Sequence, residues 1–213
     1  MDEYRNSLES WVNYRRTTDF YIEPGVAVLL SIITCGIYGF YVYYRLMERR
    51  DEHFKRMAAF SDVSTNWLRL RAQGRENVIA PELQELETVK QWMVMQSAER
   101  GAAIWLLILI FTSCIGFFIF FYLLMKDYRE HDYYEARMFS LMSSALTKLG
   151  LSQQSGQAMP NMPQREFGKY VFFSIITLGI FTFYWVYVLI DDLNKHFALQ
   201  VQWEDYVLAS LAS

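Results

Sequence analysis

Three long stretches of the chain contain no charged side chain and no histidine. They cover residues 26–44, 102–125 and 170–190, and the chain between them is densely charged. Within each stretch, large apolar and aromatic residues recur at steps of three and four, as they do along one face of a helix. At 1.5 Å per residue the stretches reach roughly 28, 36 and 31 Å, close to the ~30 Å hydrocarbon core of a bilayer. The pattern predicts three transmembrane helices.

The three stretches belong to an internal repeat. Residues 31–54 match residues 174–197 at twelve of twenty-four positions without a gap, and a weaker copy lies 78 residues after the first. His53, His131 and His196 fall on one position of the repeat. Periods of this kind indicate one structural unit used several times.

One helical face is common to all three units. A shared face predicts a shared packing surface, and small residues beside it allow helices to approach closely. The predicted helix-packing residues are Thr34, Gly36, Phe40, Tyr44, Phe118, Tyr122, Thr177, Gly179, Phe183 and Tyr187.

The predicted fold is all-α: an integral membrane protein of three transmembrane helices in a threefold repeat, each followed by a charged amphipathic helix. Residues 1–25 form an N-terminal segment whose aromatic residues favour an interfacial helix, with a disordered tail as the alternative. The three units cover residues 26–80, 81–151 and 165–213. Two prolines, a glycine and several glutamines make residues 152–164 a linker.

The course of the first stretch has two interpretations. Gly36 and Gly39 near its middle permit a kinked single helix. The segment Thr34-Cys35-Gly36 could instead turn the chain back as a re-entrant hairpin with arms of about nine residues, tolerated in lipid only where protein or water surrounds the turn. Single helices place the N-terminus outside and the first loop and C-terminus inside, because Lys and Arg concentrate after the first stretch. The hairpin alternative puts every charged segment on one side.

Residues 24–41 and their echo at residues 174–185 carry the sequences Thr34-Cys35-Gly36-Ile37-Tyr38 and Thr177-Leu178-Gly179-Ile180-Phe181. In these segments the chain resembles a bacterial membrane family known as domain of unknown function number 4234. Unit two departs from the pattern. The resemblance implies a prokaryotic multi-pass protein of the inner membrane and brings no catalytic or binding residues.

Composition narrows the function classes. The chain is 53% hydrophobic and 17% aromatic, and its net charge of −3 argues against nucleic-acid binding. Cys35 and Cys114 both lie in apolar stretches, where a disulfide framework is not expected. The sequence lacks the short motifs of metalloproteases, serine hydrolases and phosphate-binding loops. We therefore expect no enzymatic activity and no cofactor.

The histidines are the sharpest candidate for chemistry. With Glu52, Glu130, Asp132, Asp191 and Asp192 nearby, they could converge on one metal ion. Transmembrane helices that alternate in direction would place them at different membrane faces, so we expect no metal site. The remaining hypothesis is a structural, scaffolding or interaction protein whose partners are the lipid bilayer and another copy or membrane protein. A small-solute transporter or oligomeric channel is the alternative.

Overall fold

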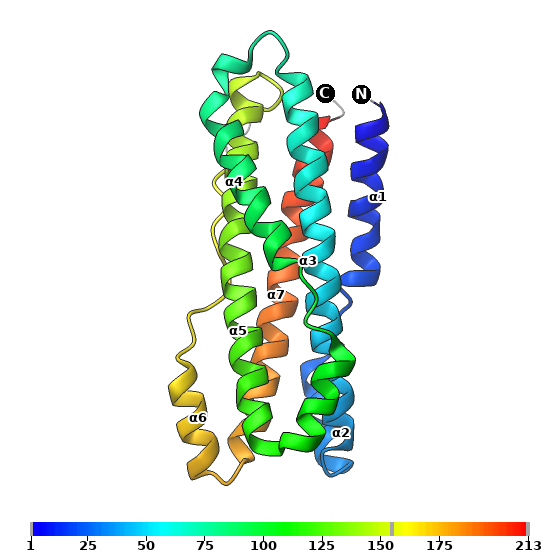
Figure 1. Ribbon diagram of the computed structural model, residues 1–213, viewed down its shortest axis with the longest axis vertical. Coiled ribbons are helices and arrows are strands. Elements are labelled where there is room, and N and C mark those ends of the chain that lie inside the picture. Colours follow the sequence, from blue (N-terminus) through cyan, green and yellow to red (C-terminus); the bar gives the residue numbers. More distant parts are fainter. Residues whose placement is uncertain (1, 154–155, 212–213) are drawn as a thin grey trace.

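The computed structural model describes residues 2–153 and 156–211, and the regular elements in that part of the chain are all helical. In chain order they are α1 (Asp2–Thr18), α2 (Pro24–Ile33), α3 (Ile37–Arg71), the short 3₁₀ helix η1 (Glu76–Val78), α4 (Ala80–Gln96), α5 (Ala102–Lys148), α6 (Phe167–Ile176) and α7 (Ile180–Leu211). Figure 1 shows an elongated bundle with both termini at one end and helical hairpin tips at the other. The predicted all-α class is confirmed.

The first and third apolar stretches each reverse direction near their middle. Residues 34–36 form the turn between α2 and α3. Cys35 and Gly36 have φ angles of 49° and 94°, the left-handed conformation that ends a helix. Leu178 and Gly179 adopt the same conformation between α6 and α7, with φ angles of 50° and 92°. The two units therefore repeat a backbone reversal as well as a sequence.

A threonine before each turn ties its two helices together. The Thr34 hydroxyl donates to the Leu30 carbonyl at 2.7 Å and accepts the Tyr38 N–H at 2.9 Å. Thr177 makes the same two bonds, at 2.7 and 2.9 Å, to the equivalent residues of α6 and α7. Backbone groups left over at a helix end need such partners. These two threonines, predicted to pack between helices, close the hairpin turns instead.

The middle stretch reverses within α5. The ring centroids of Trp105 and Phe120 lie 5.9 Å apart, although a straight helix would separate residues fifteen positions apart by roughly 22 Å. Arg100, just before α5, bonds Asp127 with an Nε–Oδ2 distance of 2.5 Å. Figure 1 shows the α5 ribbon turning back at the hairpin end. Unit two is therefore a third hairpin, bent between Trp105 and Phe120.

These reversals correct the predicted architecture. Among the described residues, no helix combines the length and apolar character needed to cross a membrane. Helices α2 and α6 have ten residues each, a rise of roughly 15 Å. The predictions of three transmembrane helices and of a multi-pass inner-membrane protein are wrong, and the alternating orientation no longer follows. An apolar run has the same sequence pattern in a transmembrane helix and in a hairpin. The left-handed turns of units one and three and the bend in α5 make the difference.

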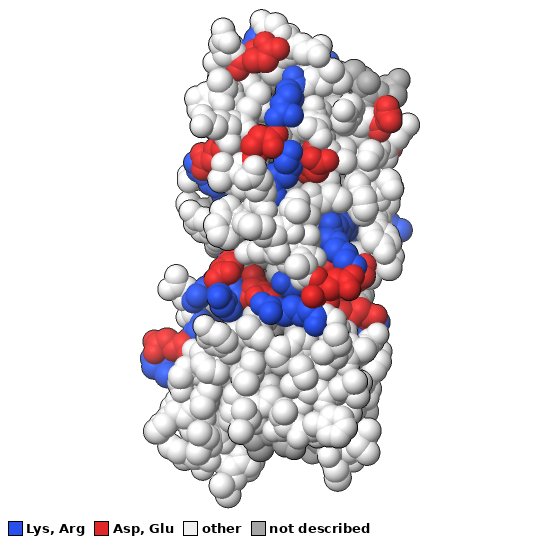
Figure 2. Space-filling model, viewed as in Figure 1, with Lys and Arg blue, Asp and Glu red and all other residues white. Residues whose placement is uncertain are grey.

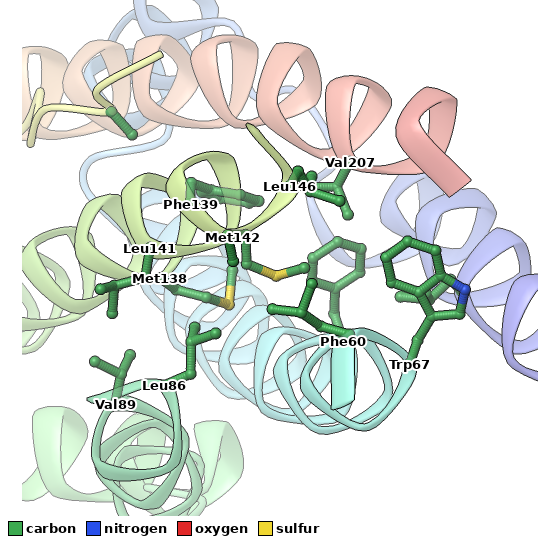
Figure 3. Packing of buried hydrophobic residues seen from close by; sticks show 14 of the residues in the cluster. Phe60, Trp67, Leu86, Val89, Met138, Phe139, Leu141, Met142, Leu146 and Val207 are labelled. Atoms are coloured by element: carbon green, nitrogen blue, oxygen red, sulfur yellow. The ribbon is translucent and has the colours of Figure 1, made fainter. Parts of the chain in front are cut away.

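The half of the molecule near the termini encloses a hydrophobic core. Phe60 and Trp67 of α3, Leu86 of α4 and Met138 of α5 are buried there, with at most 2% of each residue exposed. Figure 3 shows these side chains pointing toward one another, beside Val207 of α7. Burial of a large apolar side chain contributes about 1.5–3 kcal/mol. This core holds α3, α4, α5 and α7 in fixed register above the hairpins.

The N-terminal segment, predicted as an interfacial helix, contains helix α1, which packs on the bundle near the termini and away from the hairpin end (Figure 1). Leu8 and Val12 of α1 are buried in the same core as Phe60 and Trp67. Arg15 donates to Asp205 of α7 at 2.7 Å. The predicted linker, residues 152–164, contains no helix outside residues 154–155, which are not described. The loop therefore joins unit two to α6 along the side of the bundle, as Figure 1 shows.

The left-handed turn gives a first testable prediction. Replacing Gly179 by alanine is expected to lower the free energy of unfolding by about 1 kcal/mol, because a Cβ disfavours positive φ. Gly168 in α6 is the matched control: a Cβ at either glycine meets no atom within 4 Å, and only Gly179 has positive φ. Gly168→Ala is expected to be neutral or slightly stabilising. Urea unfolding of the full chain in detergent micelles measures both, and equal losses would contradict the conformational explanation.

Candidate functional site

The three histidines meet in the interior of the bundle. His53 of α3, His131 of α5 and His196 of α7 have at most 3% of their surface exposed. The ring centroids of His131 and His196 lie 5.2 and 5.7 Å from that of His53. The expectation that they lie at different membrane faces is wrong. Because every unit doubles back, their helices leave the hairpin end in one common direction (Figure 1).

Each histidine contacts a side-chain oxygen that lies 34 or 35 residues earlier in the chain. The pairs, with their distances from Nδ1, are His53 and Asp19 (2.8 Å), His131 and Gln96 (3.2 Å), and His196 and Asn161 (3.1 Å). An oxygen beside Nδ1 favours the tautomer with its proton there and fixes the ring orientation. Each repeat unit therefore supplies its own oxygen partner for Nδ1. This contact orients the ring and so fixes where the other nitrogen, Nε2, points.

The three Nε2 atoms face one carboxylate, that of Glu135. His53 and His131 lie 3.4 and 3.3 Å from its Oε1, and His196 lies 3.0 Å from its Oε2. None of the three Nε2 atoms has a hydrogen-bond partner of suitable geometry. Gln200 donates to Glu135 Oε1 at 3.0 Å. Glu135, one helical turn after His131, is therefore the centre of the cluster.

The surroundings drive the histidine pKa values apart. Burial lowers the pKa of His131 to about 4. Burial also disfavours the charged form of His196, but the Glu135 carboxylate outweighs it and the pKa rises to about 10. Asp19 likewise outweighs burial and raises the pKa of His53. Burial alone would raise the pKa of Glu135, but the neighbouring imidazoles hold it well below its usual value. Neutral and charged imidazoles therefore flank an ionised carboxylate at neutral pH.

Buried ion pairs adjoin the histidine cluster. Arg56, 1% exposed, donates to Asp19 at 2.6 Å and to Glu204 at 2.5 Å. Asp132 and Glu135 add two further buried carboxylates. Isolated charges are costly in a protein interior and need partners. Arg15 also lies 3.5 Å from Glu204, so cations and carboxylates alternate beside the cluster.

A layer of arginine–aspartate pairs joins the ends of two hairpins. Arg100 makes two bonds to Asp127, at 2.5 and 2.7 Å, and Arg165 makes two to Asp192, at 2.5 and 2.9 Å. Such paired contacts fix the guanidinium plane against the carboxylate. Unit one carries Arg49 at the position equivalent to the aspartates, where it donates to an amide oxygen of α7 at 3.1 Å. The repeat is therefore incomplete at this layer.

The hairpin end presents an apolar surface without charge. Phe111 and Leu178 are 83% and 94% exposed. Further exposed apolar side chains at this end are Val26, Leu29, Ile32, Ile33, Ile37, Ile104, Leu107, Ile110, Ile115, Ile119, Phe172, Phe173, Ile175, Ile176 and Ile180. Figure 2 shows no Lys, Arg, Asp or Glu over this end and a band of them at its upper boundary. All three hairpins contribute to the surface.

The predicted helix-packing residues take several positions. Phe40, Tyr122 and Tyr187 are exposed, and Phe118 is half-buried with its ring centroid 6.3 Å from that of Trp185. Of the remaining six, all half-buried, Tyr44 and Phe183 lie in helices, and Thr34, Gly36, Thr177 and Gly179 lie at the two turns. The buried face of α3 passes instead through Leu46, His53 and Phe60, at the sevenfold spacing of one helix stripe.

Sequence reasoning missed Glu135 and the partners of Nδ1. Glu135 follows His131 by four residues, the spacing of neighbours on one helix face. Its repeat equivalents are Met57 and Gln200, so alignment of the units does not single out an acid. The shared interval of 34 or 35 residues before each histidine is a signal that the sequence does contain. It becomes meaningful only once the contacts are known.

Residues 23–65 and 165–208 match the model of a protein family described as a domain of unknown function (DUF4234). The two segments are units one and three of the repeat, and each contains a turn and a histidine of the cluster. No curated protein and no solved structure matches the chain. The family resemblance predicted from the sequence is confirmed for these two segments. The family description assigns no activity, so function has to be argued from the chain itself.

Proposed function

We propose that the chain is a structural or interaction protein that docks its hairpin end into a lipid layer from one face, without crossing it. The observation that carries the proposal is the uncharged apolar surface built by all three hairpins. Exposed apolar patches larger than a few hundred Å² mark interaction surfaces. Phe111, Leu178 and the exposed apolar residues around them form such a surface at the hairpin end.

The dimensions of the hairpins suit a lipid layer. Each ten-residue arm of roughly 15 Å equals about half of a ~30 Å hydrocarbon core. The turns satisfy their own backbone groups: Gly36 N–H bonds the Ser31 carbonyl at 2.7 Å, and Gly179 N–H bonds the Ser174 carbonyl at 2.8 Å. Backbone in hydrocarbon needs such internal partners. The band of charged residues begins where the arms end, at the depth expected for headgroups (Figure 2).

The charge distribution favours lipid over a second copy of the chain. A protein–protein interface usually keeps a polar rim around an apolar centre. Here the three stretches that build the end contain no charged residue over 19, 24 and 21 positions. Lipid that surrounds every hairpin would require all of their faces to be uncharged, which accounts for this uniformity. A surface for self-association would need uncharged residues on one face only.

Liposome flotation tests the proposal. The full chain, transferred from detergent to phosphatidylcholine vesicles, is expected to float with them. Leu178→Asp should lower the partition coefficient for the vesicles about 100-fold, since a carboxylate at this depth costs about 2.5–3.5 kcal/mol. Aspartate tolerates the left-handed backbone there, so the turn is retained. Val78→Asp in η1, 46% exposed at the opposite end, is the matched control and should bind as the unaltered chain does.

Two outcomes would contradict one-sided docking. The first is equal flotation of the Leu178 and Val78 variants. The second is a detergent-stable dimer that excludes vesicles, which would assign the surface to a second copy. Single cysteines introduced at positions 22, 75 and 159, in a chain whose Cys35 and Cys114 are replaced by serine, supply the topology. All three should react with a membrane-impermeant thiol reagent added outside sealed vesicles, and protection of any one of them would show that the chain crosses.

A further inference from the structure

We propose that the buried histidine cluster binds one divalent transition-metal ion of the zinc class. His53 Nε2, His131 Nε2 and a Glu135 carboxylate oxygen are its ligands, and His196 Nε2 stands beside the other oxygen of the same carboxylate. This inference goes beyond lipid docking and does not depend on it.

The distances fit the geometry of such an ion. One ligand atom from each of His53, His131 and Glu135 lies within 4.8 Å of the other two. Ligand atoms at about 2.0–2.2 Å from a tetrahedral zinc ion are roughly 3.4 Å apart. The two histidine nitrogens are 3.4 and 3.3 Å from Glu135 Oε1. Little rearrangement is therefore needed to place an ion between them.

The hydrogen bonds leave the ligand atoms available. Every Nε2 of the cluster is buried without a hydrogen-bond partner, and an unpaired buried polar atom costs about 1–3 kcal/mol. Every Nδ1 meets an oxygen, from Asp19, Gln96 or Asn161. Metal-bound histidines almost always use their second nitrogen in this way. Both nitrogens of each ring are thus arranged as a ligand requires.

The donor atoms indicate the class of ion. The carboxylates of Asp19 and Glu204 already have the guanidinium of Arg56 as a partner, whereas Glu135 faces the three imidazoles and the Gln200 amide. Imidazole nitrogens together with carboxylate suit zinc, cobalt or iron, whereas calcium and magnesium prefer oxygen ligands alone. The donor set therefore selects the metal class.

Zinc titration of the full chain in detergent micelles, after treatment with EDTA, tests the site. Calorimetry is expected to show one Zn²⁺ per chain. Glu135→Gln keeps the shape of the side chain and should weaken binding at least 100-fold. Glu130→Gln, an exposed acid one residue before His131, is the control and should leave the affinity unchanged. Co²⁺ should give the intense visible absorption of a tetrahedral site.

Gln96 provides a second variant that does not depend on altering a ligand. Gln96 is a positioning residue that holds the His131 ring, so Gln96→Leu should weaken Zn²⁺ binding about 10- to 100-fold. The Co²⁺ spectrum should also change. Far-UV circular dichroism of the metal-free chain should stay the same. The proposal is overturned if the unaltered chain binds no Zn²⁺. It is also overturned if Glu135→Gln or Gln96→Leu, folded by circular dichroism, binds Zn²⁺ as tightly as the unaltered chain does.

Discussion

Replacing Arg56 by methionine is expected to lower the free energy of unfolding by about 3–5 kcal/mol, the cost of breaking a buried ion pair from one side. Arg56 donates to Asp19 and Glu204, and the side chains of both acids are at most 8% exposed. Methionine fills much of the arginine volume, so the loss comes mainly from two buried carboxylates that no longer contact the guanidinium. Urea unfolding at pH 7 in detergent micelles measures the change.

The controls for Arg56 separate charge from packing. Arg5 pairs with Glu9 on the surface of α1, and Arg5→Met should change stability by less than about 1 kcal/mol. Adding Glu204→Gln to Arg56→Met removes one of the stranded charges and should recover part of the loss. A double variant less stable than Arg56→Met alone would contradict the ion-pair explanation.

Asp127→Ala is expected to lower the free energy of unfolding by about 3 kcal/mol, and Asp192→Ala by about 1 kcal/mol. The repeat makes the two a matched pair, since each aspartate makes two bonds to the arginine 27 residues before it. Asp127 also accepts from Arg50 at 3.0 Å, and the Arg50 side chain is only 4% exposed. Loss of its carboxylate partner lowers the free energy of unfolding more when the cation is buried than when the cation is partly exposed to water.

The same unfolding experiment compares the two aspartates. Asp192 pairs with Arg165, whose side chain is 29% exposed and can be rehydrated. The difference of about 2 kcal/mol between the variants therefore reports the buried Arg50. Arg50→Met should reduce that difference, and equal losses in the two aspartate variants would show that Arg50 does not depend on Asp127.

Much of the helical structure could be predicted from residue spacing. The apolar stretches, the break at Pro81 where α4 begins, and the shared position of the histidines all follow from local patterns. The packing face could not be assigned in the same way. The predicted stripe contains Phe40 and Tyr187, which are exposed, and the buried stripe through Leu46 is equally apolar. Where every face of a helix is apolar, periodicity does not tell which one meets its neighbours.

The histidine cluster shows why the site could not be assembled in advance. Equivalent positions in a repeat place equivalent residues, but whether they meet depends on the direction of each helix. A straight passage through each stretch separates the histidines, and a reversal brings them together. In units one and three the reversal rests on Cys35, Gly36, Leu178 and Gly179. Only two of these are glycines, so residue type alone does not mark both left-handed positions of each turn.

The order of residues suffices to establish the repeat, the all-α class, the uncharged stretches and the alignment of the three histidines, since each depends on local spacing. The hairpin reversals, the convergence of the histidines on Glu135 and the exposure of Phe111 and Leu178 depend on contacts between residues far apart in the chain. Hydrophobic patterning depends on local sequence. It shows that a segment avoids water, but it does not show whether the chain continues straight or turns back. Packing of α3, α5 and α7 around one core supplies that direction.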